Sequence, residues 1–305
     1  MFGDKKLINK INELKKEKNA VILAHCYQRA EIDEVADFVG DSLQLSRLAA
    51  DTSAETIIFA GVYFMAETAK ILSPAKKVLI PKIEAGCRMA DMIDLDQIRE
   101  FKALYPDTPL VCYVNSTAEV KSEADICCTS ANAVQVVKSL NSAKVLFAPD
   151  KYLGTYVANQ LPDVEIITYP GYCPTHISIT VEDVEKMKSE YPEAKVLVHP
   201  ECNQNVTALA DFVGSTTAIM KYAANSDNKD FIIVTEKGVV DRLSRDYSSK
   251  NFYLVSQKAI CPNMKLTTLH DIYDVLVNEN NEVFVDEKIA ERAKKSIEKM
   301  VDVNP

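Results

Sequence analysis

One cysteine recurs at the same place in each of three similar stretches of the chain. Cys87, Cys173 and Cys261 are separated by 86 and 88 residues. A strand-like apolar run precedes each of them. Thiols at equivalent positions of three units can meet on a pseudo-threefold axis, and three thiolates suit an iron–sulfur cluster with one iron left open. The spacing therefore predicts three related units arranged around a shared centre.

The sequence between the cysteines repeats with the same period. An Ala-Asp pair begins the segments A-D-F-V-G-D-S, A-D-I-C-C-T-S and A-D-F-V-G-S-T, at Ala36, Ala124 and Ala210. An apolar strand candidate precedes each pair, and a helix candidate and a second apolar strand follow it. Seven residues beyond each cysteine lies a helix N-cap candidate, at Asp94, Thr180 and Thr268. Strands that alternate with helices predict parallel sheets with helices on both faces.

We therefore expect an α/β fold of three pseudo-threefold-related, three-layer αβα domains with small parallel sheets and an active site at their junction. The expected domains are residues 1–86, completed by the C-terminal segment 262–305, then 87–172 and 173–261. The C-terminal segment is predicted to contain a helix, a short strand E-V-F-V and a final helix from Asp286 to about Met300, and to pack back on the first domain. Chance similarity among βα units is the alternative, but four matching positions in three copies argue against it.

Composition narrows the class of protein. The net charge of −9 speaks against a nucleic-acid partner, which would require a basic surface. No apolar run approaches the roughly 20 residues that cross a bilayer. The first residues lack the apolar core of a secretory signal, so we expect a cytoplasmic protein. Eight cysteines in that setting favour reduced thiols, metal ligation or catalysis over disulfides.

Acids, bases and hydrogen-bond donors are predicted at the strand ends, where ligands bind to open parallel sheets. The positions at or just past the first strand of each unit are His25, Tyr27, Tyr113, Asn115, His199 and Glu201. Ser42, Ser130 and Thr216 follow at a fixed offset and are expected to open helices, whose free N–H groups suit carboxylate or phosphate. Plain N-capping is an equal alternative for these three. His176 follows Cys173 in C-P-T-H, whereas His270 is expected on the exposed face of a helix.

The other five cysteines do not share an offset. Cys112 alternates within a strand and is expected in the core, and Cys127 and Cys128 are expected to be packed as well. Cys26 and Cys202 lie beside candidate site residues and are the alternative metal ligands. The chain contains no CxxC, which weakens a zinc-ribbon or thioredoxin-like interpretation.

Several motifs, taken in order from about Asn19 to Met264, resemble the quinolinate synthase family. They are A-H-C-Y-Q, A-D-F-V-G-D-S-L-Q-L-S, G-V-Y-F-M-A-E, Y-V-N-S-T-A-E-V-K, C-T-S-A-N-A-V, F-A-P-D-K-Y-L-G, C-P-T-H, V-H-P-E-C and D-F-V-G-S-T. The resemblance implies a [4Fe-4S] enzyme of NAD biosynthesis that condenses iminoaspartate with dihydroxyacetone phosphate to give quinolinate, phosphate and water. It also implies a functional link to the enzyme that supplies iminoaspartate. The open iron would act as a Lewis acid.

The resemblance also implies roles for individual residues. The cluster ligands would be Cys87, Cys173 and Cys261, and the acid–base residues would be His25, Tyr27, Tyr113, His199 and Glu201. The substrate-binding residues would be His25, Ser42, Tyr113, Asn115, Ser130, His176, His199, Glu201, Ser215 and Thr216.

The chain departs from the family pattern at three places. Cys26 stands where the family usually has Asn, and Arg88 follows the first cysteine ligand where Pro is frequent. The last cysteine lies in C-P-N-M, without the further thiols that some members carry. Two rival enzyme classes also use three converging cysteines, namely the diphthamide-synthesis radical enzymes and the reductase of the last isoprenoid-precursor step. An iron–sulfur sensor or carrier is the alternative that is not an enzyme.

Overall fold

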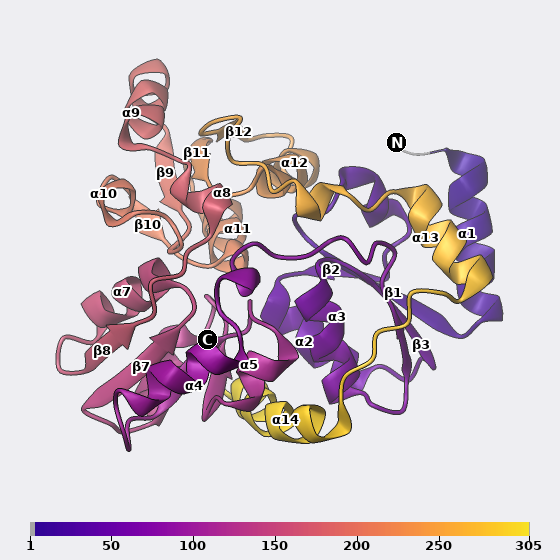
Figure 1. Ribbon diagram of the computed structural model, residues 1–305. Coiled ribbons are helices and arrows are strands. Elements are labelled where there is room, and N and C mark those ends of the chain that lie inside the picture. The colour runs from indigo at the N-terminus through magenta and orange to yellow at the C-terminus, as the bar shows by residue number, and fades with distance from the viewer. Residues whose placement is uncertain (1–3, 305) are drawn as a thin grey trace.

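The computed structural model describes residues 4–304 and contains three four-stranded parallel sheets with one strand order (Figure 1). Residues 1–3, where the expected first domain begins, and residue 305 lie outside the described residues. The first sheet has the order β2 (Phe38–Gly40), β1 (Ala20–His25), β3 (Thr56–Ala60), β4 (Lys77–Leu79). The second has β6 (Ile126–Cys128), β5 (Leu110–Tyr113), β7 (Lys144–Ala148), β8 (Glu165–Thr168). The third has β10 (Phe212–Val213), β9 (Lys195–Val198), β11 (Asp230–Val234), β12 (Asn251–Leu254).

Helices flank each sheet, which confirms the predicted α/β class. Around the first sheet they are α1 (Lys5–Glu17), α2 (Ser42–Asp51) and α3 (Tyr63–Leu72). Around the second they are α4 (Leu95–Ala103), α5 (Ala118–Ser122), α6 (Ala133–Ser139) and α7 (Lys151–Gln160). Around the third they are α8 (Pro174–Ile177), α9 (Val181–Glu190), α10 (Gln204–Thr207), α11 (Thr216–Asn225) and α12 (Lys237–Asp246). The C-terminal helices are α13 (Leu269–Asn278) and α14 (Glu287–Asp302), and short 3-10 turns span Ala30–Glu34, Ala90–Met92 and Asn263–Lys265.

The layered packing follows from the alternation of side chains along each strand. Val21 and Leu23 of β1 pack in the core on the side of α2 and α3, whereas Ile22 and Ala24 pack on the side of α1 and α13. The third sheet is divided in the same way between α9 and α10 on one face and α11 and α12 on the other. The strands can therefore be apolar throughout, as the sequence is.

The recurring Ala-Asp pair has a structural explanation. The Asp37 carboxylate accepts a hydrogen bond from the backbone N–H of Ile22 at 2.8 Å, and so ties the chain before β2 to β1. Asp125 accepts from Leu110 and Asp211 from Val196, both at 2.8 Å, so the second and third sheets are tied alike. The short strands β2, β6 and β10 follow these residues and are elements that the apolar pattern did not predict.

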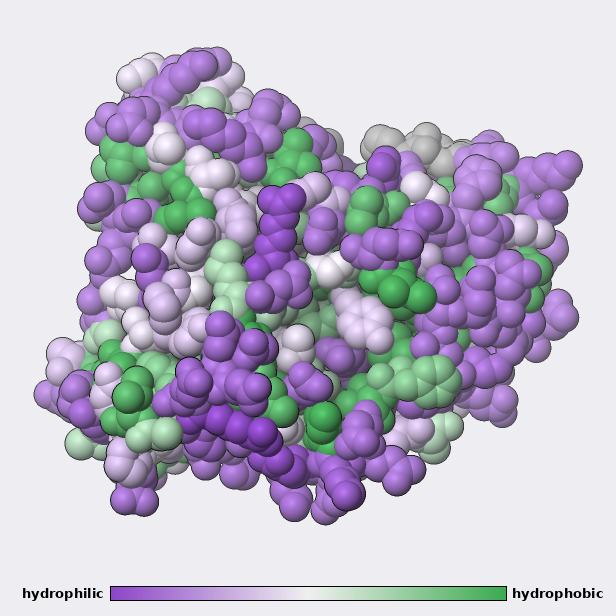
Figure 2. All heavy atoms as spheres, in the orientation of Figure 1, coloured by the Kyte–Doolittle hydropathy of each residue, from purple (hydrophilic) through white to green (hydrophobic). Residues whose placement is uncertain are grey.

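The predicted capping boxes at Asp94, Thr180 and Thr268 are all present, at the starts of α4, α9 and α13. Cys112, Cys127 and Cys128 are fully buried in β5 and β6, and His270 is exposed on α13, as expected. No helix of the described chain is long and apolar enough to cross a bilayer. On the face shown in Figure 2, hydrophilic residues predominate and hydrophobic ones are scattered among them.

The C-terminal segment differs in part from its prediction. Helix α13 packs on α1, at the first sheet, but α14 lies against α5 and β6 of the second sheet as well as α2 and α3 (Figure 1). The predicted strand E-V-F-V is wrong, because that stretch forms only one isolated bridge, between Leu79 and Glu282. β4 is three residues long, so it offers little edge for another strand to pair with. The four strands of each sheet fall within one expected domain, and the domain boundaries themselves stay a prediction.

Candidate active site where the three sheets meet

The three recurring cysteines lie in loops beyond the last strand of each sheet. The same backbone hydrogen bond fixes each loop. Its donor is the N–H of the first residue in the helix that follows the third strand, and its acceptor is the carbonyl two residues before the cysteine. These bonds join Tyr63 to Ala85 (2.8 Å), Lys151 to Gly171 (2.9 Å) and Lys237 to Ala259 (2.9 Å). The shared anchor explains how one spacing in the sequence becomes one geometry in three units.

One cavity of about 260 Å³ gathers residues from all three sheets. This is a volume for small ligands, just under the roughly 300–1,000 Å³ of drug-sized clefts. Cys87, Cys173 and Cys261 all line it. The other predicted site residues in its lining are His25, Tyr27, Ser42, Tyr113, Asn115, Ser130, His176, His199, Glu201 and Thr216. The sequence positions aligned by offset are therefore brought together in space.

Ser215 is placed differently from the prediction. It is the N-cap of α11, where its hydroxyl accepts the Ala218 N–H at 3.3 Å, and the described lining of the cavity does not include it. Ser42 and Thr216 are the first residues of α2 and α11, as expected, but the caps are Asp41 and Ser215. The expectation that Ser130 opens a helix is wrong, because α6 begins three residues later with Asn132 as its cap.

Glu201 connects several candidate residues. Its Oε1 accepts the Tyr113 hydroxyl at 2.7 Å, and its Oε2 lies 2.6 Å from His176 Nδ1. Because a carboxylate can only accept, Nδ1 of His176 carries the proton. Nε2 of the same ring lies 2.9 Å from the Thr235 hydroxyl, and the ring stacks on His199 with centroids 4.6 Å apart. The carboxylate thus orients a tyrosine and a histidine from two other segments.

His25 and His199 are oriented by one local device. Nδ1 of His25 accepts the backbone N–H of Tyr27 at 3.2 Å, and Nδ1 of His199 accepts that of Glu201 at 3.4 Å. A ring nitrogen that accepts has no proton of its own, so each neutral ring carries its proton on Nε2. The Tyr27 hydroxyl lies 2.9 Å from that of Thr216 and 3.0 Å from that of Thr235.

Burial sets the protonation states in the cavity. It lowers the pKa of His25 to about 3, with help from the charge of Lys265, and it lowers that of His199 to about 3 as well. Burial, together with Glu201, raises the pKa of Tyr113 well above its usual range. Burial acts to raise the pKa of Glu201 too, but its interactions with His176 and His199, together with the hydrogen bonds from His176 and Tyr113, outweigh burial and the pKa falls to about 2. At neutral pH the site therefore has an ionised carboxylate, the neutral imidazoles of His25 and His199, and a protonated phenol.

The donor set fits an iron–sulfur cluster. Three thiols from three loops line one cavity, and burial raises the pKa of each, that of Cys87 to about 12. Neutral thiols tolerate an apolar pocket, and metal binding would displace their protons. The alternative ligands are placed elsewhere, since the described lining of the cavity includes neither Cys26 nor Cys202, and the Cys202 thiol points to the Val234 carbonyl at 3.7 Å.

Two cations and one unsatisfied amide also face the cavity. Arg88 and Lys258 line it, and Arg88 has no ion-pair partner within residues 4–304. The buried Oδ1 of Asn115 finds no hydrogen-bond partner in the described chain either. A buried polar atom without a partner costs free energy unless a ligand or water satisfies it. The Oδ1 of Asn115 can therefore accept a hydrogen bond from a polar ligand.

Thr235 and Glu236 are residues of the site that the sequence patterns did not indicate. They follow β11 directly, and Glu236 lines the cavity while Thr235 links Tyr27 to His176. Their position at the carboxyl end of a parallel strand could have indicated them. The predicted site residues after the first strand of each sheet occupy the same kind of position. The repeat alignment did not single out this third-strand position, because Val62 and Asp150 occupy it in the other units.

Known proteins resemble this chain over nearly its whole length. A family model described as quinolinate synthetase A protein matches residues 9–302. A protein named quinolinate synthase from Alkaliphilus metalliredigens is 53% identical over 302 residues, which is 99% of this chain and 100% of that protein. Another of the same name from Dehalococcoides mccartyi is 56% identical over 295 residues, 97% of each chain. A third, from Clostridium kluyveri, is 53% identical over 97% of this chain and 98% of that protein.

Proposed function

Because this chain belongs to the quinolinate synthase family, enzymes of NAD biosynthesis, we propose that it condenses iminoaspartate with dihydroxyacetone phosphate to give quinolinate, phosphate and water. The observation that carries the proposal is the single cavity in which three thiols, an ionised carboxylate, two tyrosines and three histidines converge. A carrier or sensor would need the thiols but has no use for this set of acids and bases. Iminoaspartate hydrolyses as imines do, so we also propose a functional link to the enzyme that supplies it.

The thiols of Cys87, Cys173 and Cys261 would hold a [4Fe-4S] cluster. When bound, it supplies an iron with an open position that can act as a Lewis acid on a substrate oxygen. The ligands come from three different sheets, so the cluster would also cross-link the loops that carry them. The neighbouring Glu201 and His176 are already hydrogen-bonded to each other and lie beside Cys173, whose sulfur is 3.2 Å from His176 Nδ1.

Both proposed substrates are anions, and the cavity wall holds groups that can bind them. The first residues of α2 and α11, Ser42 and Thr216, lie in its wall, so the N-terminal ends of two ten-residue helices face it. Arg88 adds a cationic side chain, and so does Lys258, whose ammonium also pairs with Asp183 at 3.2 Å. A protein with a net charge of −9 can thus bind a dicarboxylate and a phosphate through local features alone.

Loss of water and phosphate requires several proton transfers. The protonation states of the residues in the cavity indicate which of them can accept a proton and which can donate one. Glu201 is ionised at neutral pH and can take up a proton, whereas Tyr113 keeps its proton and can donate it. His25 and His199, neutral and protonated on Nε2, can donate a hydrogen bond to a substrate oxygen. We propose Glu201 and His25 as the main pair, with Glu201 accepting a proton and His25 donating a hydrogen bond from Nε2 to the substrate.

An anaerobic assay tests the proposal. The protein is purified and reconstituted with iron and sulfide without oxygen, then incubated with iminoaspartate and dihydroxyacetone phosphate. We expect quinolinate and phosphate in equal amounts. A preparation that holds an intact cluster and forms no quinolinate would overturn the proposed function. Parallel incubations with S-adenosylmethionine, or with an allylic diphosphate and a reductant, test the two rival enzyme classes.

A further inference from the structure

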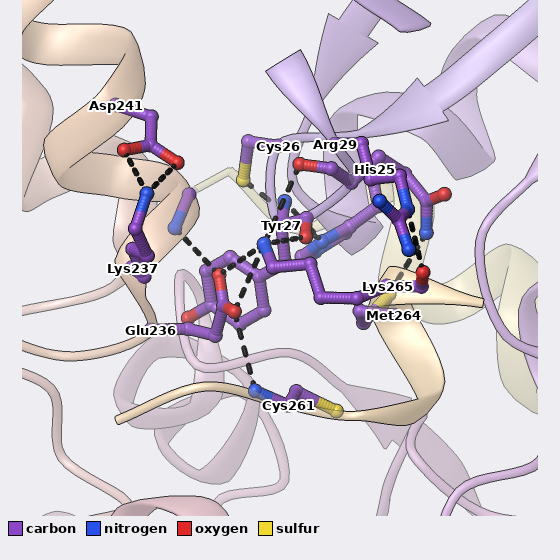
Figure 3. Close-up of polar contacts among 12 residues, drawn as sticks. His25, Cys26, Tyr27, Arg29, Glu236, Lys237, Asp241, Cys261, Met264 and Lys265 are labelled. Atoms are coloured by element: carbon purple, nitrogen blue, oxygen red, sulfur yellow. Dashed lines mark hydrogen bonds and ion pairs between the residues drawn. The ribbon is translucent and has the colours of Figure 1, made fainter. Parts of the chain in front are cut away.

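Glu236 is a fully buried carboxylate that contacts the loop of the third cysteine. It follows β11 and is the N-cap residue of α12. Its Oε1 accepts the backbone N–H of Cys261 at 3.2 Å, and its Oε2 accepts that of Gly238 at 2.6 Å (Figure 3). One side chain therefore joins the end of the third sheet to the segment that presents a candidate cluster ligand.

Lys265 approaches the same carboxylate from the other side. Its Nζ lies 3.0 Å from Oε1 and 3.1 Å from Oε2 of Glu236. The same ammonium donates to the backbone carbonyl of Tyr27 and, at 3.4 Å, to that of Gln28 (Figure 3). The side chain of Lys265 is only 18% exposed, so water screens this ion pair weakly.

The three segments that meet here are far apart in the sequence and tightly packed in space. A Cβ atom on Gly238 would lie 2.5 Å from the Cys26 carbonyl oxygen and 2.8 Å from the Tyr27 Cα. The start of α12 is thus in close contact with the residues that follow β1. The Glu236–Lys265 ion pair holds the Cys261 loop next to both. Tyr27 is fixed at its carbonyl by Lys265 and at its hydroxyl by Thr235, the residue next to Glu236.

The equivalent position in the other units shows what is particular to the third. Asp150 caps α7 and is fully buried beside the second cysteine loop. Burial raises its pKa well above the usual range, while the backbone N–H of Cys173 is among the groups that lower it. Val62 occupies the equivalent position before α3. Two of the three cysteine loops therefore have a buried carboxylate nearby, and within the described chain only that of the third both accepts the cysteine N–H and has a lysine partner.

We propose that the Glu236–Lys265 ion pair is a positioning device, which fixes the Cys261 thiol and Tyr27 relative to each other across the cavity. The inference rests on the proposed function, because it assumes that Cys261 is a cluster ligand. Neither residue needs to touch the substrate for this role. Partners that orient a metal ligand typically change metal affinity or activity by about 10–100-fold when removed.

The first test measures how firmly the holoenzyme holds its iron. Glu236→Gln and Lys265→Met each break the ion pair, and Lys237→Met is the matched control. Lys237 follows Glu236 in the chain, and its side chain pairs with Asp241 on the same helix (Figure 3). It serves as a control because that side chain does not contact Cys261 or Tyr27. We expect iron to pass to a chelator about 10–100-fold faster in the two variants than in the wild type. Lys265→Arg, which keeps the charge, should lie closer to the wild type than Lys265→Met does.

The second test reads the position of the thiol without the cluster. The full-length protein, freed of iron under anaerobic conditions, is treated with iodoacetamide, and labelling of the Cys261 and Cys87 peptides is compared by mass spectrometry. We expect Glu236→Gln and Lys265→Met to raise labelling of Cys261 several-fold relative to Cys87. A variant that labels both thiols faster in equal proportion has loosened the whole fold, and this result would contradict a positioning role.

The outcomes separate the inference from the function on which it rests. If the wild type holds a cluster and both variants lose iron at the wild-type rate, the positioning role is wrong and the proposed function stands. If the wild type does not hold a cluster under any condition tried, the proposed function fails first. Faster iron loss in both variants, with an unchanged Lys237→Met control, supports the inference.

Discussion

A single carboxylate, that of Glu201, orients residues from two other parts of the cavity. It accepts the Tyr113 hydroxyl at 2.7 Å and lies 2.6 Å from His176 Nδ1, and all three residues are buried. Its pKa of about 2 keeps it ionised across the physiological range. At neutral pH it is therefore unprotonated, as a general base must be, but so low a pKa makes it a weak base.

Replacing Glu201 with Gln tests this role directly. The amide keeps the size and one hydrogen-bond acceptor but cannot take up a proton. We expect Glu201→Gln to retain the wild-type iron and sulfide content and to lower kcat by about 10²–10⁴-fold. Anaerobic assay of quinolinate alongside iron analysis measures both quantities. Turnover close to that of the wild type would show that the base is another residue.

The buried neutral His25 gives a prediction for stability. Its folded pKa of about 3 lies below the ordinary value of 6.5, so the unfolded chain takes up a proton below pH 6.5 that the folded chain refuses. Stability is therefore lost as the pH falls from 6.5 towards 3. This group should contribute about 2 kcal/mol of that loss between pH 7 and pH 5.

Urea unfolding of the iron-free protein at pH 7 and pH 5 measures this loss. His25→Asn should lose less stability than the wild type over this interval, and the exposed His270→Asn is the control that should behave like the wild type. Equal losses in all three proteins would contradict a buried, neutral His25.

At the scale of elements, the sequence predicted the long features well and the short ones poorly. The apolar runs correctly located β1, β3, β5, β7, β9 and β11, because strands of four to six mostly buried residues leave a clear pattern. β2, β6 and β10 have only two or three residues, too few for a period to be visible. Their positions depend on aspartates such as Asp37, whose carboxylate reaches back to the preceding strand.

For the candidate site, too, some residues could be predicted from the sequence and others could not. Residues of the first strand in each unit were found by offset, since their role follows from their place in the repeat. Glu236 and Lys265 were not found, because 29 residues separate them and only the fold brings them together. Ser215 was carried over from a family motif, and the structure uses its hydroxyl as a helix cap.

The junction of α12 with β1 leads to a prediction at this scale. Alanine normally favours a helix over glycine by about 1 kcal/mol, but at Gly238 its Cβ would lie 2.5 Å from the Cys26 carbonyl oxygen. The close contact should prevail, and we expect Gly238→Ala to destabilise the protein by about 1–3 kcal/mol. Ser244→Ala, at an exposed position of the same helix, should be neutral or slightly stabilising. Denaturant unfolding compares the two, and an unchanged Gly238→Ala would show that the two elements can separate freely.

At the scale of the whole molecule, three sheets of one strand order each contribute a loop to one cavity. Each loop alone offers a single thiol, and only the assembly of the three brings three thiols into one cavity. Helix α14 packs against elements of both the first and the second sheet, so the C-terminal segment helps to fix their relative placement. The repeat in the sequence therefore has its functional meaning only in the complete chain.

The iron and sulfide content of single cysteine variants tests this account most directly. After anaerobic reconstitution, the wild type should hold the iron and sulfide of one [4Fe-4S] cluster per chain. Cys87→Ser, Cys173→Ser and Cys261→Ser should each lose most of it, while Cys202→Ser, whose thiol points into the core of the third sheet, should retain it. A full cluster in any of the first three variants, or its loss in Cys202→Ser, would contradict the assignment of one ligand to each of the three units.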